Sequence, residues 1–180
     1  MKKINMGCGW RNFGKDWIHI DGGSYEHLDY NNINVLPFED NSIDLIYASH
    51  VIEYFDLIEI NTLLKEWNRV LKKGSTLRVA VPDFSVMAQL YVDKKYNLNN
   101  FIGPIFGRMK MGEDFIYHKV VYDIDLLTKM LNDNKFVNVK KYDWKLTDHS
   151  HFDDHSQAYL PHMDKDNGTL ISLNIECIKE

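Results

Sequence analysis

The chain has 180 residues, 44% of them hydrophobic, and a formal net charge of -5. This length permits one well-buried domain and is too short for two ordinary ones, so we expect a single domain over residues 1–180. An acidic chain without a basic stripe is a poor nucleic-acid binder, because neutralising phosphates requires clustered Lys and Arg. We therefore expect a small-molecule substrate and no nucleic-acid partner.

Cysteine usage and hydropathy indicate a cytoplasmic protein that makes no membrane contact. Cys8 and Cys177 lie far apart and have no CxxC spacing, which is typical of reduced thiols. No apolar run approaches the length of a membrane span, and the first residues lack the apolar core of a signal peptide. The sequence leaves the oligomeric state open.

Two short strands are expected at the start of the chain. Residues 2–6 form the first and run into Gly7-Cys8-Gly9, and residues 17–20 form the second, which ends at Asp21. After the glycine turn only residues 10–16 remain between them, whereas a parallel crossover usually needs roughly a dozen residues or more. The first helix of this unit is therefore expected to be reduced to a turn or lost.

The segment 36–54 combines a turn, a buried strand and an abrupt polar ending. Residues 40–42 have turn chemistry, and residues 43–48 are nearly all apolar, as in a strand covered on both faces. Ser49 and His50 follow directly. Ligands of parallel sheets bind at the carboxyl ends of strands, so these two residues mark a candidate site.

Helices and strands alternate through the rest of the chain. An amphipathic helix over residues 57–72 has a capping box at Asp56 and Glu59 and a stop signal at Gly74. Earlier in the chain, residues 24–35 are expected to form a polar connection with at most a short strand at 33–35. After the helix we expect strands at 76–81, 136–142 and 170–178, helices at 85–96 and 123–131, and an irregular excursion at 97–118 that is a candidate lid.

This alternation predicts a doubly wound, mainly parallel α/β sheet with a reduced first helix and an antiparallel strand at the C-terminus. Within it, Gly7-Cys8-Gly9 does not fit a dinucleotide fingerprint, because Asn12 stands where the third glycine belongs. A ligand without phosphate needs only close backbone approach and an acceptor for its ribose hydroxyls. Asp21, at the end of the second strand, is placed to be that acceptor.

Taken in order, these segments resemble the class I S-adenosylmethionine-dependent methyltransferases, in their small type-11-like branch. The matching segments are residues 4–9 (INMGCG), Asp21, residues 36–54 (LPFEDNSIDLIYASHVIEY) and residues 66–75 (EWNRVLKKGS). The resemblance covers about residues 3–84 and, more loosely, residues 123–142. It implies a Rossmann-like methyltransferase fold, S-adenosylmethionine as cofactor and S-adenosylhomocysteine as product.

The resemblance also assigns roles to residues. It implies that Gly7 and Gly9 face the methionine part of the cofactor, that Asp21 holds the ribose and that Leu36 lines the adenine. Ser49 and His50 are implied to lie beside the sulfonium. The candidate cofactor-binding residues are Gly7, Cys8, Gly9, Asp21, Gly22, Leu36, Ser49 and His50.

Methyl transfer from a sulfonium is an in-line displacement that needs no covalent residue, only an acceptor held in near-attack geometry. A hydroxyl or ammonium acceptor must also lose a proton. The candidate general bases are His50, Asp83 and His118. Glu53 could be an exposed acid or an anchor for neighbouring loops, and Arg69 is better explained as a structural ion-pair partner. The acceptor is expected to be a small molecule or a sugar-like glycan precursor.

Two other functions remain open at this point. Asn5 and Arg11 depart from the family pattern and, with the reduced first helix, they motivate a non-catalytic binding or scaffold module of the same fold. A metal-dependent enzyme is motivated by a C-terminal histidine loop. That loop contains His149, His151, His155 and His162, and an extended backbone would point the first three, together with Asp153, to one face.

Overall fold

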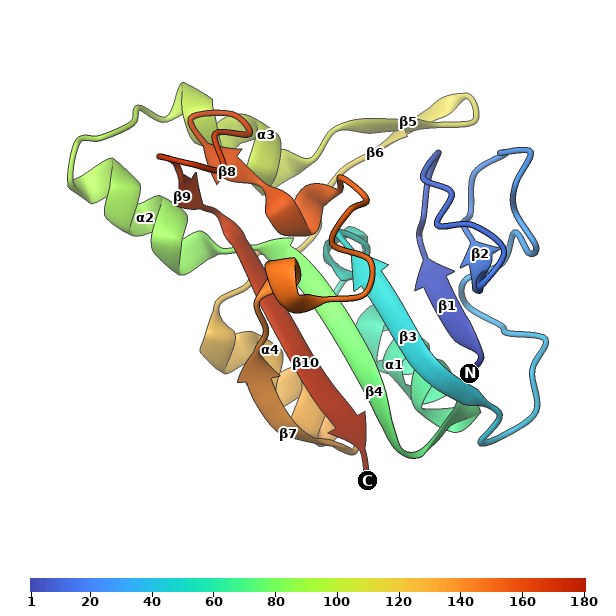
Figure 1. Ribbon diagram of the computed structural model, residues 1–180. Coiled ribbons are helices and arrows are strands. Elements are labelled where there is room, and N and C mark those ends of the chain that lie inside the picture. Colours follow the sequence, from blue (N-terminus) through green and yellow to red (C-terminus); the bar gives the residue numbers. More distant parts are fainter.

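A six-stranded mixed sheet runs through the centre of the protein, which a computed structural model describes over all residues 1–180 (Figure 1). The strands lie in the order β2-β1-β3-β4-β10-β7. Their bounds are β1 Lys3–Met6, β2 Trp17–Ile20, β3 Ile43–Ser49, β4 Leu71–Pro82, β7 Phe136–Lys141 and β10 Ser172–Lys179. Strands β2, β1, β3 and β4 are parallel to one another, and β10 is antiparallel to both β4 and β7. The predicted mainly parallel α/β sheet with an antiparallel C-terminal strand is confirmed.

No helix connects β1 to β2, as the short connection predicts. Residues 7–16 pass from one strand to the next through turns, and Arg11 N–H donates to the carbonyl oxygen of Cys8 at 3.1 Å. No strand forms at 33–35, where the sequence allowed at most a short one. The side chain of Asn32 instead accepts the backbone N–H groups of Asn34 and Val35, at 2.9 and 3.1 Å, so this segment turns.

Three of the predicted helices begin at side-chain caps. Helix α1 (Glu59–Val70) starts with a reciprocal capping box, because Glu59 N–H donates to Asp56 Oδ1 and Asp56 N–H donates to Glu59 Oε2, both at 2.8 Å. Asp83 caps α2 (Phe84–Val92) and Asp123 caps α4 (Ile124–Asp133). The helix expected at 85–96 ends earlier than predicted, and Lys94 has a left-handed φ of 56° just beyond it.

The excursion at 97–118 is more regular than predicted. It contains helix α3 (Asn99–Phe106) and a hairpin of β5 (Met109–Met111) and β6 (Asp114–Ile116). In Figure 1 this hairpin extends from α3 across the ends of the sheet towards β1 and β2. A Cβ atom at Gly22 would lie 3.8 Å from Sδ and Cε of Met111, so the hairpin packs beside the end of β2.

The two faces of the sheet are covered differently. Alternate side chains of β3 divide between them: Ile46 and Ala48 join the main core with α1 and α4, whereas Leu45 and Tyr47 pack on an aromatic cluster with Phe13. Figure 1 shows α1 and α4 behind the sheet and the C-terminal loop in front. That loop holds the short elements η2 (Trp144–Leu146), η3 (His155–Gln157), β8 (Tyr159–Leu160) and β9 (Thr169–Leu170), and η1 (Ile52–Tyr54) follows β3. None of the helices has the length and apolar character needed to cross a bilayer.

Candidate functional site

The Gly7–Gly9 turn, Asp21 and Ser49-His50 meet at one edge of the sheet. Met6, the last residue of β1, pairs with Ile20 of β2 on one side and with Ala48 of β3 on the other. The residues that follow these three positions are therefore neighbours at the carboxyl ends of the parallel strands. This is the edge at which open α/β sheets bind ligands.

Gly7 permits the close packing of this edge. Its φ is 63°, and a Cβ atom there would lie 2.3 Å from Cγ2 of Val51, the residue after His50. Only glycine fits both this left-handed conformation and this contact. Gly9 also has a left-handed φ, of 58°, but a Cβ atom there would meet nothing within 4 Å. The turn thus packs on the Val51 side and faces open space at Gly9.

Asp21 holds the turn through its carboxylate. Oδ2 accepts the N–H of Gly9 at 2.8 Å and Oδ1 accepts the N–H of Gly23 at 2.7 Å. The side chain is largely buried, yet each carboxylate oxygen can accept a further hydrogen bond. Cys8 is buried beside it, and burial together with the Asp21 charge raises the pKa of this thiol to about 12. Cys8 is therefore a protonated, unreactive thiol at neutral pH.

His50 turns away from the end of β3 in a left-handed conformation, with φ of 55°, and its N–H donates to the carbonyl oxygen of Ala80 at 2.8 Å. Its Nδ1 lies 3.3 Å from Oε1 of Glu53, and its Nε2 lies 3.5 Å from Oγ of Ser172 on β10. The His155 ring is 5.1 Å away between centroids. Burial, followed by His155, His118 and Arg11, holds the pKa of His50 well below its usual value, so the imidazole is neutral.

Glu53 is fully buried, so its interpretation as an exposed acid is wrong. Its Oε1 lies between Nδ1 of His50 and Nε2 of His118, which is 3.8 Å away. Burial raises the pKa of Glu53 to about 8. The i, i+3 spacing of His50 and Glu53 around the short helix η1 is the sequence signal that could have indicated this contact.

His118 joins the same cluster from the segment that follows the hairpin. Its Nδ1 lies 3.0 Å from the carbonyl oxygen of Pro104 in α3, and its ring stacks edge-on against Tyr54 at 4.6 Å. The Tyr54 hydroxyl donates to the carbonyl oxygen of Gly107 at 2.8 Å. Tyr54 therefore holds the end of α3 against this part of the site.

Ser49 and the C-terminal loop are joined through Asp154. Oδ1 of Asp154 accepts from Ser49 Oγ at 3.4 Å and from the N–H of Ser156 at 2.8 Å, and Oδ2 accepts from the Tyr47 hydroxyl at 2.5 Å. Asp154 also begins η3, which places His155 beside His50. The sequence alone did not indicate Asp154, His155 or Ser172 as neighbours of β3, because they lie more than 100 residues away in the chain.

Two candidate residues lie apart from this cluster. The Asp83 carboxylate caps α2 by accepting the Val86 N–H at 3.2 Å, and it makes no hydrogen bond or ion pair with His50 or His118. Leu36 is buried in the main core, with its backbone held by residues of α1, so its contact with adenine stays a prediction.

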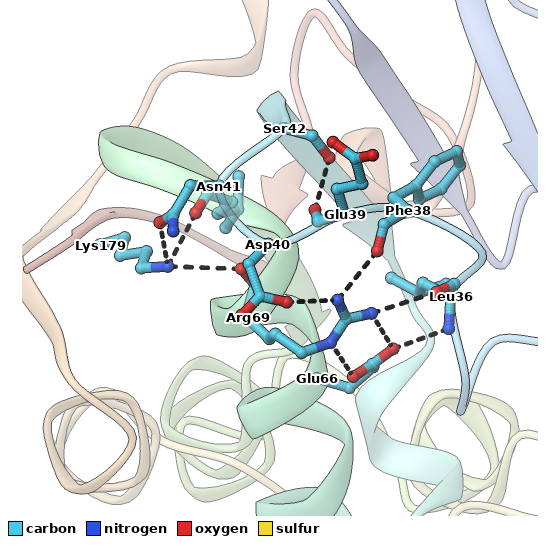
Figure 2. Close-up of polar contacts among 10 residues, drawn as sticks. Leu36, Phe38, Glu39, Asp40, Asn41, Ser42, Glu66, Arg69 and Lys179 are labelled. Carbon is cyan, nitrogen blue, oxygen red and sulfur yellow. Dashed lines mark hydrogen bonds and ion pairs between the residues drawn. The ribbon is translucent and has the colours of Figure 1, made fainter.

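Arg69 is a structural residue, as predicted (Figure 2). It forms a bidentate pair with Glu66, at 2.8 and 2.7 Å, and an ion pair with Asp40 at 2.7 Å. The same guanidinium donates to the carbonyl oxygens of Leu36 and Phe38, at 3.1 and 2.8 Å, while Glu66 accepts the Leu36 N–H at 2.8 Å. This arrangement clamps residues 36–40 onto α1.

We expect Arg69→Met to lower the free energy of unfolding by about 2 kcal/mol, because it leaves the partly buried Glu66 carboxylate and two carbonyl groups without their donor. Urea unfolding would measure the loss. Lys65→Met, an exposed change on the same helix, is the matched control and should change the stability by less than about 0.5 kcal/mol. Equal stabilities of the two variants would contradict the clamp.

The histidine loop does not form a metal centre. His149 is buried against Phe13, Trp17 and Tyr47, with ring centroids 5.7, 5.6 and 4.1 Å away, and burial lowers its pKa to about 4. His151 and His162 are exposed, and His155 packs near His50. The loop turns instead of extending, and no group of three or more His, Cys, Asp or Glu side chains is arranged to hold a metal ion. The metal-dependent alternative therefore has no ligand set in the structure.

Comparisons with known proteins found methyltransferases. Residues 15–79 match a family model described as a methyltransferase domain, of the type-11 group. The chain is 35% identical over 86 residues to a demethylmenaquinone methyltransferase of Staphylococcus haemolyticus, and this match covers 46% of the chain and 34% of the relative. The chain thus spans about a third of the length of that curated relative.

Solved structures share the fold over nearly the whole chain. A methyltransferase structure from Methanosarcina mazei is 19% identical with a TM-score of 0.60, and the match covers 99% of this chain and 92% of that one. A methyltransferase structure from Archaeoglobus fulgidus is 14% identical with a TM-score of 0.59, and the match covers 99% of this chain and 86% of that one. The cofactor that this family and fold imply is S-adenosylmethionine. Residues 15–79 thus match a methyltransferase domain of the type-11 group, and the chain as a whole shares the fold of solved S-adenosylmethionine-dependent methyltransferases.

Proposed function

We propose that the protein is a methyltransferase that moves the methyl group of S-adenosylmethionine to a small-molecule or glycan-precursor acceptor. The observation that supports this most strongly is the junction of the Gly7–Gly9 turn, the Asp21 carboxylate and His50 at the carboxyl edge of the sheet. We further propose that residues 1–180 act as one domain in the cytoplasm. The curated relative is named for a quinone, and a quinone is one small-molecule class to include in an acceptor screen.

The residues at this edge fit the cofactor. The backbone of Gly7, Cys8 and Gly9 can lie against its methionine part, since the space at Gly9 is open. Asp21 can accept from ribose hydroxyls with its remaining lone pairs while it still holds Gly9 and Gly23. We assign Ser49 and His50 to the sulfonium side and Gly22 to the rim beneath the hairpin. When bound, the cofactor supplies an electrophilic methyl group.

The chain's own contribution is to orient the acceptor, exclude water and accept a proton. The hairpin contacts this edge at Gly22 and the C-terminal loop contacts it at His50, so we assign these two segments as the walls that would hold an acceptor. His50 is the base that we favour, because it lies at this edge and is neutral. Asp83 is the weakest of the three candidate bases, since its carboxylate already caps α2.

Calorimetry with S-adenosylmethionine and S-adenosylhomocysteine tests this function. We expect micromolar binding of both, and at least a tenfold loss in Asp21→Ala, because that change removes the ribose acceptor and releases the Gly9 turn. Asp16→Asn, an exposed change without side-chain partners, is the matched control and should bind like the wild type. No binding at millimolar concentrations by the folded wild-type protein would refute the proposal, whereas binding without any methyl transfer across acceptor classes would favour the non-catalytic module.

A further inference from the structure

The carboxyl group of Glu53 is buried without a hydrogen-bond partner. Neither Oε1 nor Oε2 has a donor within hydrogen-bonding geometry, and the side chain is fully shielded from solvent. Imidazole nitrogens of His50 and His118 lie 3.3 and 3.8 Å from Oε1. An ionised carboxylate in such a place would be strongly disfavoured unless a proton or a cation joined it. We call these three residues the His50–Glu53–His118 cluster.

Hydrogen bonds at both ends of this cluster point away from it. The carbonyl oxygen of Pro104 can only accept, so Nδ1 of His118 carries the proton there and Nε2 faces Glu53 without one. At the other end Asn174 donates to the carbonyl oxygen of Ser156 at 2.8 Å, so its Oδ1 accepts the Ser172 hydroxyl at 2.9 Å. The lone pairs of Ser172 therefore face Nε2 of His50.

A count of protons follows from these directions. Three contacts lie between His118 and Ser172: His118 to Glu53, Glu53 to His50, and His50 to Ser172. A neutral His50 beside an ionised Glu53 supplies only one proton for all three, which leaves two contacts without a proton. The cluster can therefore take at least one further proton, on Glu53 or on His50.

The cluster adjoins the position that we propose for the cofactor. Gly7 packs on Val51, the residue after His50, and Met6 pairs with Ala48, two residues before His50. S-adenosylmethionine carries a positive sulfonium, whereas S-adenosylhomocysteine has a neutral thioether in its place. A positive charge within several ångströms of a partly desolvated proton site disfavours the proton.

We propose that the His50–Glu53–His118 cluster holds one proton in the free protein and releases it when the positively charged cofactor binds. This inference rests on the proposed function. The released proton leaves the cluster able to take the proton of a hydroxyl or amine acceptor. In the transfer, the acceptor lone pair forms the new bond to the methyl carbon, the carbon–sulfur electron pair stays on sulfur, and the acceptor proton passes to the cluster.

The charges around the cluster are consistent with this assignment. Burial raises the pKa of Glu53 and lowers the pKa of His118, so the extra proton rests on Glu53. On the side of β3 that faces the C-terminal loop, Arg11 and His155 lower the pKa of His50 further. The two other titratable groups near Glu53 are the phenols of Tyr54 and Tyr122, which stay protonated because burial raises the pKa of each. No other charged side chain pairs with Glu53, so a cofactor charge would act on it directly.

Calorimetry in two buffers of different ionisation enthalpy measures the protons released on binding. At pH 7 we expect the wild-type protein to release roughly one proton more with S-adenosylmethionine than with S-adenosylhomocysteine. Both ligands share the same amino and carboxyl groups, so the difference reports the sulfonium alone. Glu53→Gln should remove this difference, while Glu39→Gln, an exposed acid elsewhere on the chain, should keep it.

Failure of the proton-release proposal and failure of the proposed function give different results in this experiment. Equal proton release with both ligands in the wild-type protein would overturn the inference, and that comparison needs no variant. A difference that persists in a Glu53→Gln protein that still binds S-adenosylhomocysteine would also overturn it. Failure of the wild-type protein to bind either ligand would refute the proposed function, and this inference with it.

Discussion

Raising the pH from about 5 to 8 is expected to destabilise the wild-type protein relative to Glu53→Gln. Burial raises the folded-state pKa of Glu53 to about 8, from an ordinary value near 4.5. Between these values the folded protein keeps a proton that the unfolded chain has lost, so the stability that this group contributes is full below 4.5 and disappears as the pH rises through 8. The limiting slope for one proton is about 1.4 kcal/mol per pH unit.

The glutamine variant cannot titrate, so the difference between the two proteins isolates Glu53. We expect the free energy of unfolding of Glu53→Gln, relative to that of the wild type, to increase by roughly 1 kcal/mol per pH unit between pH 5 and 8. The buried histidines have lowered pKa values and act in the opposite direction, since their contribution grows as the pH rises. Both proteins share them, so their effect largely cancels.

Urea unfolding at several pH values would measure this difference. Glu39→Gln, which changes an exposed acid, should follow the wild-type pH curve. Parallel curves for Glu53→Gln and the wild type would show that Glu53 is ionised in the folded state. That result would also remove the proton on which the cofactor-linked release depends.

Gly7→Ala is expected to lower the stability by about 3 kcal/mol and to weaken cofactor binding at least tenfold. The substitution places a side chain at a left-handed φ of 63° and brings its Cβ to 2.3 Å from Val51 Cγ2, far inside carbon–carbon contact distance. Overpacking of this kind typically adds about 1 to 3 kcal/mol to the backbone strain. The turn must then move away from β3, which opens the edge where the cofactor is proposed to bind.

Gly14→Ala is the control that separates backbone strain from the steric clash with Val51. Gly14 has a left-handed φ of 83°, but a Cβ atom there would meet nothing within 4 Å, so only the strain of about 1 kcal/mol is expected. Val51→Ala in the Gly7→Ala background removes the colliding methyl groups and should restore part of the stability. Urea unfolding and calorimetry on this set would test the assignment, and equal losses in Gly7→Ala and Gly14→Ala would contradict it.

Much of the fold could be predicted because its signals are local. The apolar run at residues 43–48, the capping box of Asp56 and Glu59, and the short connection after Gly9 each act within a few residues, and the structure confirms them. The prediction was wrong at two places. The helix expected at 85–96 ends before Lys94, which has a left-handed φ, and the excursion at 97–118 formed a helix and a hairpin that its Asn, Gly and aromatic residues do not distinguish from irregular chain.

The amino-acid sequence by itself determined the alternation of strands and helices, the loss of the first helix and the edge at which the candidate site lies. These follow from short-range periodicity and from the geometry of parallel strands. Only the tertiary structure decided which distant residues surround His50 and Glu53: His118 from beyond the hairpin, Ser172 from β10 and His155 from the C-terminal loop. No local pattern encodes contacts between residues this far apart in the chain, because packing of separate elements brings them together. The burial that results is also what changes the protonation of Glu53 and His50.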